Sequence, residues 1–234
     1  MLQQYVWDTP IVSDTSGYIR FLDTKRLVSL AKTYHVKLRV VRRVGLFVPA
    51  GTPLVLASKG ERLPADAIHE LRLAFDLGPS RTLQQDVEFG ILQIVDIALK
   101  AISPAVNDPT TAISCVDQLS RIMIRVAAKD PPEGLLYDPP GVFRVSIPWK
   151  DFDHLLTSAF EQIRMYAKGD IAVNLRMLRA LGDIAFTTPI AALREQLFAL
   201  GQRIVDGCEE KLGEEELTPL RGRLAALEDL ACHS

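Results

Sequence analysis

The sequence predicts an α+β protein, in which a small bent β-sheet module with helices at the N-terminus is followed by a mainly helical, bundle-like region. Three observations predict this class. Apolar and basic residues alternate over 36–41, which is typical of a half-buried strand. Glycines and prolines punctuate short apolar runs over 44–57, as in the tight turns of a strongly bent sheet. The last third of the chain repeats apolar residues at helical steps. We therefore predict a module over 1–80 and a mainly helical domain over 81–234.

The first elements follow from local signals. Tyr5 and Trp7 are expected to hold the irregular N-terminal end against the body of the module. Residues 17–22 have the composition of a strand. Asp23 is a natural N-cap, because its carboxylate can accept from the free N–H groups of a helix predicted over 24–34.

The next strand has one apolar and one basic face, since Lys37 and Arg39 alternate with valine and leucine. We interpret the basic face as a solvated sheet face. The turn spacing over 44–57 is similar in shape to that of biotinyl or lipoyl carrier barrels, but no attachment lysine lies on a hairpin there. The resemblance therefore concerns shape alone and makes the module barrel-like.

The module is predicted to close with a short helix over 64–71 and a returning strand over 74–77, before a Gly-Pro-Ser link. Further along, the proline-rich segment 129–142 shows no periodicity and is expected to be a connection. A strand with alternating faces is predicted over 142–147.

A central helix pair is predicted over 84–103 and 108–128. In the first helix, apolar residues recur at three- and four-residue steps and form a wide stripe. Ser103-Pro104 ends it, because the residue before a proline is pushed out of the helical region. Asp108 caps the second helix, with Pro109 at the first helical position, where a missing N–H costs nothing.

Four more helices complete the predicted bundle, and each carries an apolar stripe at helical spacing. They are expected over 149–167, 170–186, 188–210 and 214–231. Their leucine, methionine and phenylalanine side chains are interpreted as core, not as a cofactor-binding box, and no repeat is detectable.

The segment RTLQQDVEFGILQIVDIALKAISPAVNDPTTAISCVDQL, residues 81–119, resembles a bacterial family of predicted membrane proteins of unknown function. The upstream SGYIRFLDTKRLVSLAK and VGLFVPAGTPLVLA fit the pattern of the same family. Members carry transmembrane helices at the N-terminus, followed by a soluble region, which this chain resembles over nearly all its length. The resemblance implies membrane association and supplies no activity or catalytic residues.

Composition excludes several classes of protein. A net charge of −2 argues against a general nucleic-acid binder. No run approaches the roughly 18 to 20 apolar residues of a membrane span, and the first ten residues do not read as a signal peptide. The three cysteines lie far apart, so neither a zinc site nor a disulfide framework is indicated, and a reducing compartment is favoured.

Charge is unevenly distributed along the chain. Residues 1–80 contain 11 Lys and Arg against 7 Asp and Glu, whereas residues 81–234 contain 16 against 22. The basic part could face an anionic membrane surface, where each nearby Lys or Arg adds up to about 1 kcal/mol. A solvated surface of mixed charge is the alternative.

The sequence contains no recognisable catalytic or cofactor motif. HExxH, GxSxG, the Walker A pattern and GxGxxG are absent, and the four histidines lie in four separate elements. We therefore predict no catalytic residues, no metal site and no cofactor. A divalent ion among the acidic and amide side chains of the helix pair is a weaker interpretation.

One polar group is a candidate ligand-binding site. It consists of Arg81, Asp86, Asp96, Asn107, Asp108, Thr110 and Thr111. A helix N-terminus with free N–H groups suits an anion, and the threonine hydroxyls and the arginine could complete such a site. Capping is the favoured interpretation of Asp108, because its carboxylate would occupy the same donors. For Asp96, the alternative is an exposed stripe where it pairs with Lys100.

Three functional hypotheses remain. The first is a soluble regulatory, ligand-sensing or assembly domain of a membrane-associated protein, whose partners are its own transmembrane region or the membrane surface and whose soluble part is cytoplasmic. The second is an enzyme or a phosphometabolite-binding module that uses the helix corner around Pro109. The third is a scaffold that self-associates into a homo-oligomer through its C-terminal helices.

Overall fold

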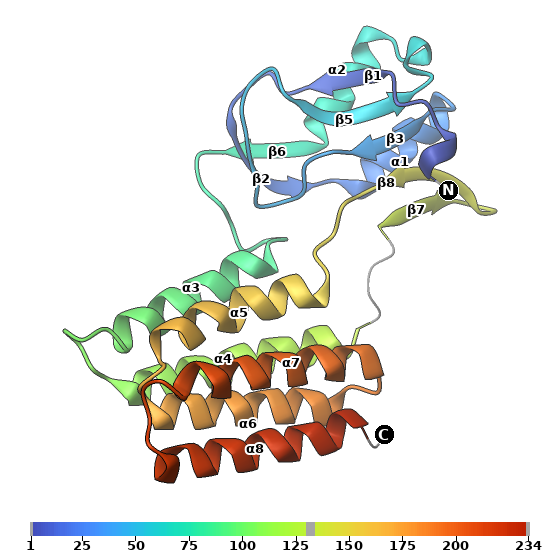
Figure 1. Ribbon diagram of the computed structural model, residues 1–234. Coiled ribbons are helices and arrows are strands. Elements are labelled where there is room, and N and C mark those ends of the chain that lie inside the picture. Colours follow the sequence, from blue (N-terminus) through green and yellow to red (C-terminus); the bar gives the residue numbers. More distant parts are fainter. Residues whose placement is uncertain (1, 130–133, 233–234) are drawn as a thin grey trace. The chain divides into compact units, whose positions relative to one another are not determined.

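The chain folds into two units, each with its own hydrophobic core, as the computed structural model in Figure 1 shows. The structure describes residues 2–129 and 134–232. The N-terminal unit contains residues 2–89 and 134–149, and the helical unit contains residues 90–129 and 150–232. The α+β class is confirmed, with the sheets in the first unit and a wholly helical second unit.

The N-terminal unit contains a five-stranded sheet with the order β1-β5-β3-β8-β7. The strands are β1 (Thr9–Val12), β3 (Lys37–Val40), β5 (Pro53–Ser58), β7 (Leu135–Asp138) and β8 (Val142–Ser146). Neighbouring strands are antiparallel except for β3 and β8, which are parallel. A parallel pair needs a long connection, and here the intervening chain includes the first helices of the other unit.

A second, three-stranded antiparallel sheet has the order β4-β2-β6. Its strands are β2 (Gly17–Leu22), β4 (Phe47–Val48) and β6 (Phe75–Gly78). The short 3-10 helices Leu2–Gln4 and Gly60–Arg62 complete the irregular parts of the unit.

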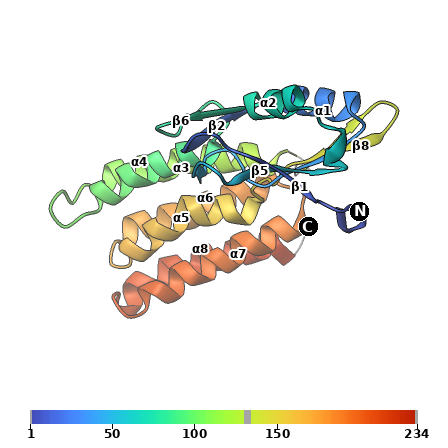
Figure 2. The same cartoon turned by 90° about the horizontal axis from the view of Figure 1, so that it is seen from above.

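Helices α1 (Thr24–Thr33) and α2 (Ala65–Leu73) lie together on one side of the five-stranded sheet (Figure 2). Asp23 caps α1 as predicted, because its carboxylate accepts from the N–H of Arg26. The core between helices and sheet is apolar, and Leu27 of α1 and Leu38 of β3 are both fully buried in it. Side chains alternate along a strand, so Lys37 and Arg39 point to the opposite face.

Strand β7 is a difference from the sequence-based expectation, which left residues 129–142 as a connection. Its backbone pairs with the next strand, β8, in a hairpin around the turn 139–141, which propensity over a proline-rich segment does not reveal. The N-terminal unit therefore does not end at residue 80, as the predicted division has it, but also takes residues 134–149. Strands β7 and β8, which the predicted division includes in the 81–234 domain, therefore belong to the first unit.

Six helices form the helical unit within its described residues, 90–129 and 150–232. They are α3 (Val87–Ala101), whose first turn belongs to the N-terminal unit, α4 (Pro109–Ala127), α5 (Phe152–Tyr166), α6 (Ile171–Thr187), α7 (Ala191–Cys208) and α8 (Glu214–Cys232). Helix α6 is central, because it packs against α4, α7 and α8. Its Met177 and Leu181 are fully buried. None of the described helices is both long and apolar enough to cross a bilayer.

The predicted central helices, 84–103 and 108–128, are present as α3 and α4 with slightly shorter bounds. Helix α3 begins late because Asp86 accepts from the N–H of Phe89 and so occupies the capping position. Helix α4 begins at Pro109 as predicted. The most extensive packing partner of α4 is α6, which the sequence did not indicate.

Candidate functional site

Arg81 is the centre of a charged cluster at the start of α3, within the N-terminal unit. Its Nε donates to Oδ2 of Asp86 at 2.7 Å, and its Nη2 lies 3.0 Å from Oε2 of Glu88. The guanidinium carbon also lies 5.1 Å from the ring centre of Phe89. Asp86 is only 4% exposed, so the guanidinium compensates a carboxylate that would be costly to bury alone.

The neighbouring side chains show that this cluster holds the backbone in place. The amide of Gln85 accepts from the N–H of Leu22 at 2.9 Å and donates to the carbonyl of the same residue at 3.3 Å. The segment before α3 is thereby tied to the end of β2. Gly45 approaches the cluster from the loop before β4, with a φ of +89°. These contacts account for Arg81 and Asp86 structurally.

The corner between α3 and α4 has the capping geometry that the sequence favours. Oδ1 of Asp108 accepts from the N–H of Thr111 at 3.1 Å, and Oδ2 accepts from the hydroxyl of Thr111 at 2.5 Å. These bonds, the hydroxyl first, hold the pKa of Asp108 below its ordinary value of 3.8. Asn107 precedes the cap with a φ of +48°. Thr110 is exposed, and its carbonyl accepts from Ser114.

Asp96 lies on the exposed side of α3, with Gln93 and Lys100 also exposed. The exposed-stripe interpretation is confirmed. The predicted ion pair is wrong for the described residues, in which Asp96 and Lys100 are not within ion-pair distance. Both side chains are exposed and remain hydrated, and exposed pairs of this kind contribute little.

The candidate residues therefore form two separate groups and one isolated member. Arg81 and Asp86 lie together before α3, whereas Asn107, Asp108, Thr110 and Thr111 lie together after it. Fifteen helical residues, about 22 Å of helix, separate the two groups. Asp96 lies between them. Ligand binding by these residues stays a prediction.

A groove of about 440 Å³ opens at the corner, inside the helical unit. Asn107 and Pro104 line it from the corner, and Tyr166 and Asp170 line it from the turn between α5 and α6. The Tyr166 side chain is 72% exposed. The carboxylate of Asp170 already accepts from the N–H of Val173, so it serves as the cap of α6.

Two basic residues on the helix-covered side of the five-stranded sheet share one carboxylate. Lys32 lies 2.9 Å from Asp138, and Arg144 lies 3.4 Å from the same carboxylate. These contacts lower the pKa of Asp138, the hydrogen bond from Lys32 being the largest cause. On the opposite side, Lys37 and Arg39 form no ion pair with any described residue.

We call that opposite side the basic sheet face, defined by Lys37, Arg39, Leu56, Tyr137, Phe143 and Ser146. The register shift in the β7–β8 pair sets its composition. It places Tyr137 opposite Phe143, while Arg144 is turned to the helix side, where it also reaches the carbonyl of Ala31. Lys37 donates to the carbonyl of Phe143, and its ammonium lies 5.8 Å from that ring centre.

Four aromatic rings gather on this face. Tyr5 lies 5.6 Å from Phe143 and 5.7 Å from Trp7, and Tyr137 lies 6.1 Å from Phe143, all between ring centres. Tyr5 thus holds the N-terminal end to the body, as the sequence suggested. The aromatic cluster was missed, because it depends on the β7–β8 pairing; two aromatic residues flanking a Pro-Pro-Gly turn were the available signal.

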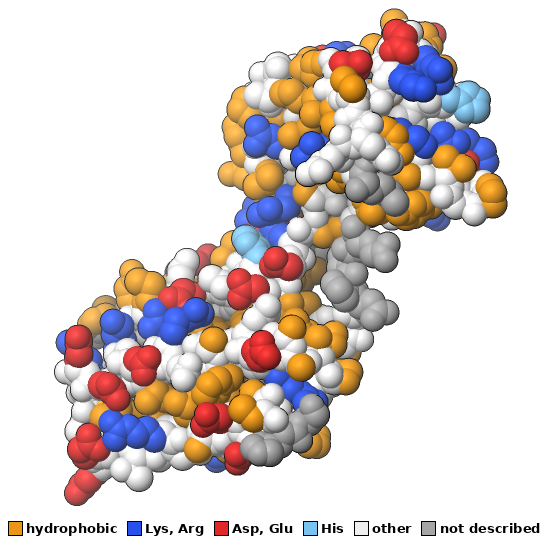
Figure 3. Space-filling model, turned by 45° about the vertical axis from the view of Figure 1, so that its right-hand side comes forward, with side chains coloured by type: hydrophobic (Ala, Val, Ile, Leu, Met, Phe, Trp, Pro, Cys, Tyr) orange, Lys and Arg blue, Asp and Glu red, His pale blue; other side chains and the backbone are white. Residues whose placement is uncertain are grey.

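A groove of about 370 Å³ lies beside the aromatic cluster. Arg39, Leu56 and Ser146 line it from the sheet, and Leu2 and Leu135 line it from the N-terminal segment and β7. Burial lowers the pKa of Lys37, and the nearby charges of Arg144 and Lys59 lower it further. Lys37 and Arg39 therefore place positive charge on this face, and neither has a carboxylate partner in the part of the chain that the structure describes. Figure 3 shows both acidic and basic side chains on the visible face of each unit.

Metal ligation has no support among the described residues, where no three His, Cys, Asp or Glu side chains gather closely enough to hold an ion. Cys115 and Cys208 are buried free thiols, and burial raises the pKa of each, which makes them poor nucleophiles.

Comparison with known proteins gives a consistent result. The model of a family described as "Predicted membrane protein (DUF2254)" matches residues 4–183. Uncharacterized proteins of Mycobacterium bovis and Mycobacterium tuberculosis are each 32% identical over 184 residues, covering 75% of this chain and 34% of the relative. The chain thus spans about a third of the length of the curated relatives that it matches. No solved structure matches it significantly.

Proposed function

We propose that this chain, which belongs to the DUF2254 family of predicted membrane proteins, is a regulatory or assembly domain. The domain contacts an anionic membrane surface through its basic sheet face. The observation that carries the proposal is the composition of that face. Lys37 lies over the ring of Phe143, which belongs to a cluster of four aromatic rings, and neither Lys37 nor Arg39 has a carboxylate partner among the described residues.

Charge is the first support. Basic residues near an anionic leaflet each contribute about 1 kcal/mol, provided that protein carboxylates do not already neutralise them. Arg39 meets this condition because it is exposed and lines the groove. Lys37 meets it in part, since its ammonium donates to a backbone carbonyl, which leaves its charge uncompensated.

Aromatic residues are the second support. Tyrosine and tryptophan are enriched at membrane–water interfaces, because the ring prefers the apolar boundary while the hydroxyl or indole N–H remains hydrated. Tyr137 is 40% exposed on this face. The indole N–H of Trp7 donates to the carbonyl of Leu2, so the N-terminal segment 2–7 is held next to the aromatic cluster. Anionic lipids are concentrated in the cytoplasmic leaflet, and we accordingly place the domain on the cytoplasmic side.

The test is sedimentation of the 234-residue chain with vesicles of phosphatidylcholine alone or with phosphatidylserine added. We expect binding to the anionic vesicles only, and weaker binding at higher salt because exposed charges are screened. The substitution Arg39→Glu should reduce the partition coefficient at least about fivefold, which corresponds to the loss of one favourable charge.

Lys25→Glu is the matched control. Lys25 is exposed on α1, on the helix-covered side, and forms no ion pair with a described residue. Both variants change net charge by the same amount, so a difference between them reports the position of the charge. Equal loss in the two variants, or equal binding to both vesicle types, would contradict the proposal.

A second candidate function, ligand sensing at the helix corner, is favoured by the groove that Asn107 lines. Thermal-shift screening with phosphorylated metabolites tests it, and Asn107→Gly, which keeps the backbone conformation accessible, should abolish any shift that arises there. A self-associating scaffold is the third candidate. Phe186, 77% exposed on α6, is the most exposed large apolar side chain of the described residues. Light scattering that gives a monomer at all concentrations would remove this candidate.

A further inference from the structure

A groove of about 460 Å³ runs along α6 and α8 in the helical unit. Leu178, Gly182 and Phe186 line it from α6, and Ala226 and Leu230 line it from α8. The groove shares no residue with the groove at the helix corner or with the groove beside the basic sheet face. None of the residues of the predicted ligand site lines it.

Phe186 leaves most of its side chain in solvent. It lies in the last turn of α6, is 77% exposed, and stands at one end of the groove. A buried aromatic side chain removes roughly 150 to 250 Å² of surface from water, and aromatic residues are the commonest anchors of protein interfaces. Phe186 therefore has the character of an interface anchor beside an apolar groove.

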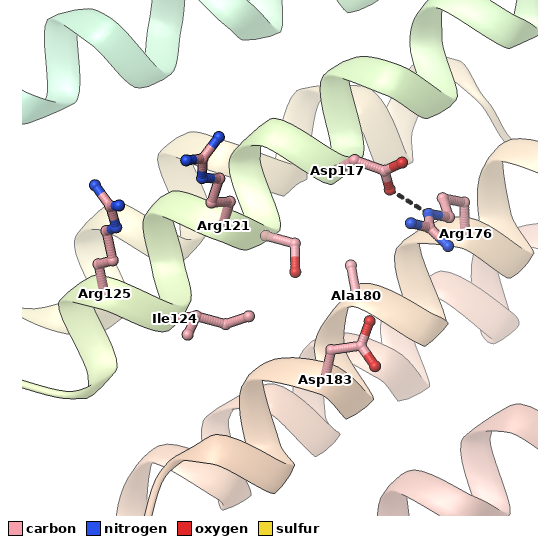
Figure 4. A pocket seen from close by; sticks show the side chains of 8 residues that line it. Asp117, Arg121, Ile124, Arg125, Arg176, Ala180 and Asp183 are labelled. Carbon is pink, nitrogen blue, oxygen red and sulfur yellow. Dashed lines mark hydrogen bonds and ion pairs between the residues drawn. The ribbon is translucent and has the colours of Figure 1, made fainter.

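Three charged side chains also line the groove, and none of them has an ion-pair partner among the described residues. Arg179 and Asp183 lie four residues apart on α6, in the weaker order for an intrahelical pair, and Arg223 lies on α8. Arg176 of α6 does not neutralise Asp183, because its guanidinium is paired with Asp117 of α4 (Figure 4). The groove thus presents uncompensated charge of both signs.

Helical spacing makes this surface of α6 complementary to itself. Arg179, Gly182 and Phe186 recur at three- and four-residue steps and so share one face of the helix. When two copies of α6 pack antiparallel and cross between residues 182 and 183, Arg179 of one copy lies opposite Phe186 of the other. Asp183 of that second copy lies one turn from its Phe186, so the same guanidinium can stack on the ring and pair with the carboxylate.

The same contacts are not available within one chain. Arg179 and Phe186 are two turns, roughly 10 Å, apart along α6, and Arg179 and Asp183 are not within ion-pair distance in the part of the chain that the structure describes. A two-fold axis, in contrast, forms each contact twice, because an isologous interface uses the same surface on both copies.

Gly182 lies at the crossing point of this arrangement. A β-carbon at position 182 would meet no atom within 4 Å, so packing inside the chain does not require glycine there. Glycine in a helix interior is less favourable than other residues except proline. Because the side chains at a contact set how closely two helices approach, a glycine at the crossing allows the closest approach of a second α6.

We propose that the groove along α6 and α8 binds a second copy of this chain, with the two α6 helices antiparallel about a two-fold axis at Gly182. This assignment rests on the third candidate function, self-association, and supplies its interface. A second copy is the occupant because it brings both signs of charge at the matching spacing. A purely acidic partner would leave Asp183 opposed, and a purely basic partner would leave Arg179 and Arg223 opposed.

Sedimentation equilibrium of the 234-residue chain over a range of concentrations tests the proposal, and we expect a reversible dimer. Phe186→Ser should raise the dimer Kd about tenfold or more, because it removes one aromatic anchor from each copy. Met165→Ser is the matched control. Met165 is 54% exposed on α5 and does not line the groove, so its substitution should leave the Kd unchanged.

Gly182→Arg tests the close approach of the helices. It should raise the dimer Kd about tenfold or more, because a long charged side chain then stands at the crossing point. The fold should survive, since position 182 faces open space and arginine forms helices better than glycine does. Gly222→Arg is the control, because Gly222 lies on α8, also faces open space and does not line the groove. Circular dichroism of both variants reports retention of the helices.

Charge exchange gives the most specific expectation. Arg179→Asp and Asp183→Arg should each weaken the dimer, because each places like charges opposite one another between the copies. The double variant should recover most of the lost affinity, because the exchanged charges pair again across the two-fold axis. Charges that act only within each chain predict no such recovery.

A monomer at all concentrations overturns this proposal together with the third candidate function. Self-association that Phe186→Ser and Met165→Ser change equally, or that the double charge exchange does not restore, overturns the proposed interface and leaves self-association in place. The vesicle experiment is independent of this one, because the basic sheet face and the groove share no residue.

Discussion

Gly45 and Asp86 are so close that a β-carbon at position 45 would lie 2.2 Å from Oδ2 of Asp86. The same β-carbon would lie 3.0 Å from Nη2 of Arg81. The loop before β4 therefore packs directly on the Arg81–Asp86 ion pair, and only a residue without a side chain fits there.

Gly45→Ala should destabilise the N-terminal unit strongly. The backbone conformation, with φ at +89°, disfavours alanine by roughly 1 to 2 kcal/mol, and the new methyl group must also displace a buried ion pair. Gly51→Ala is the control, because φ is +79° there but the β-carbon would meet open space. Urea denaturation should show a loss in unfolding free energy at least about 2 kcal/mol larger for Gly45→Ala. Equal losses in the two variants would mean that the close contact of a β-carbon at position 45 with Asp86 does not destabilise the fold.

Arg81→Gln should lower the free energy of unfolding by about 2 to 4 kcal/mol, because it takes the guanidinium from a carboxylate whose side chain is 3% exposed. Asp76→Asn is the comparison, since it removes a charge from the exposed pair between Arg20 and Asp76 and should cost under about 1 kcal/mol. Chemical denaturation of both variants measures the difference. A cost for Arg81→Gln as small as that for Asp76→Asn would show that the cluster does not hold α3.

The cap of α4 predicts a pH dependence. The pKa of Asp108 is depressed in the folded chain, chiefly by the hydroxyl of Thr111. A depressed pKa means that the folded state favours the carboxylate, so this stabilisation is complete above the unfolded value near 3.8 and is lost as pH falls through the lower folded value.

Nuclear magnetic resonance titration of the Asp108 carboxyl carbon checks this expectation. Thr111→Val removes the hydroxyl and should raise the pKa of Asp108 toward 3.8. Thr110→Val changes an exposed neighbour whose hydroxyl makes no hydrogen bond to the cap, and should leave the pKa unaltered. The capping argument fails if both substitutions shift the titration equally.

Asn107 should tolerate glycine better than alanine. Its φ of +48° lies in the left-handed region, which asparagine and glycine enter more readily than alanine does. We expect Asn107→Ala to cost about 1 kcal/mol and Asn107→Gly clearly less. Thermal unfolding of the two variants gives the ranking. If Asn107→Gly were the more destabilising substitution, the side chain of Asn107 and not its backbone conformation would matter for stability.

Sequence patterns predicted those features that depend on neighbours along the chain. The caps at Asp23 and Asp108 and the proline start of α4 are all local, because the capping oxygen and the N–H that it accepts from lie three residues apart. Both central helices were recognisable for the same reason.

Features that depend on distant residues were not predictable in this way. The β7–β8 hairpin joins the five-stranded sheet through the pairing of β8 with β3, and the aromatic cluster of Tyr5 and Phe143 joins residues at opposite ends of the unit's sequence. Among the candidate residues, the spacing of Arg81 and Asp86 did not reveal that they satisfy each other. The sequence suggested that Arg81 and Asp86 are available to a ligand, whereas in the fold the two side chains form an ion pair with each other.

The return of β7 and β8 into the N-terminal sheet has a consequence for synthesis. Strand β3 emerges from the ribosome long before β8. The edge of β3 that pairs with β8 therefore stays without a partner while about a hundred further residues are synthesised. A fragment that stops at residue 89 would retain that bare edge permanently, and should aggregate where the intact chain does not. A fragment designed to express the N-terminal unit alone should therefore include β7 and β8, for example by joining residue 89 to residue 134 through a short linker.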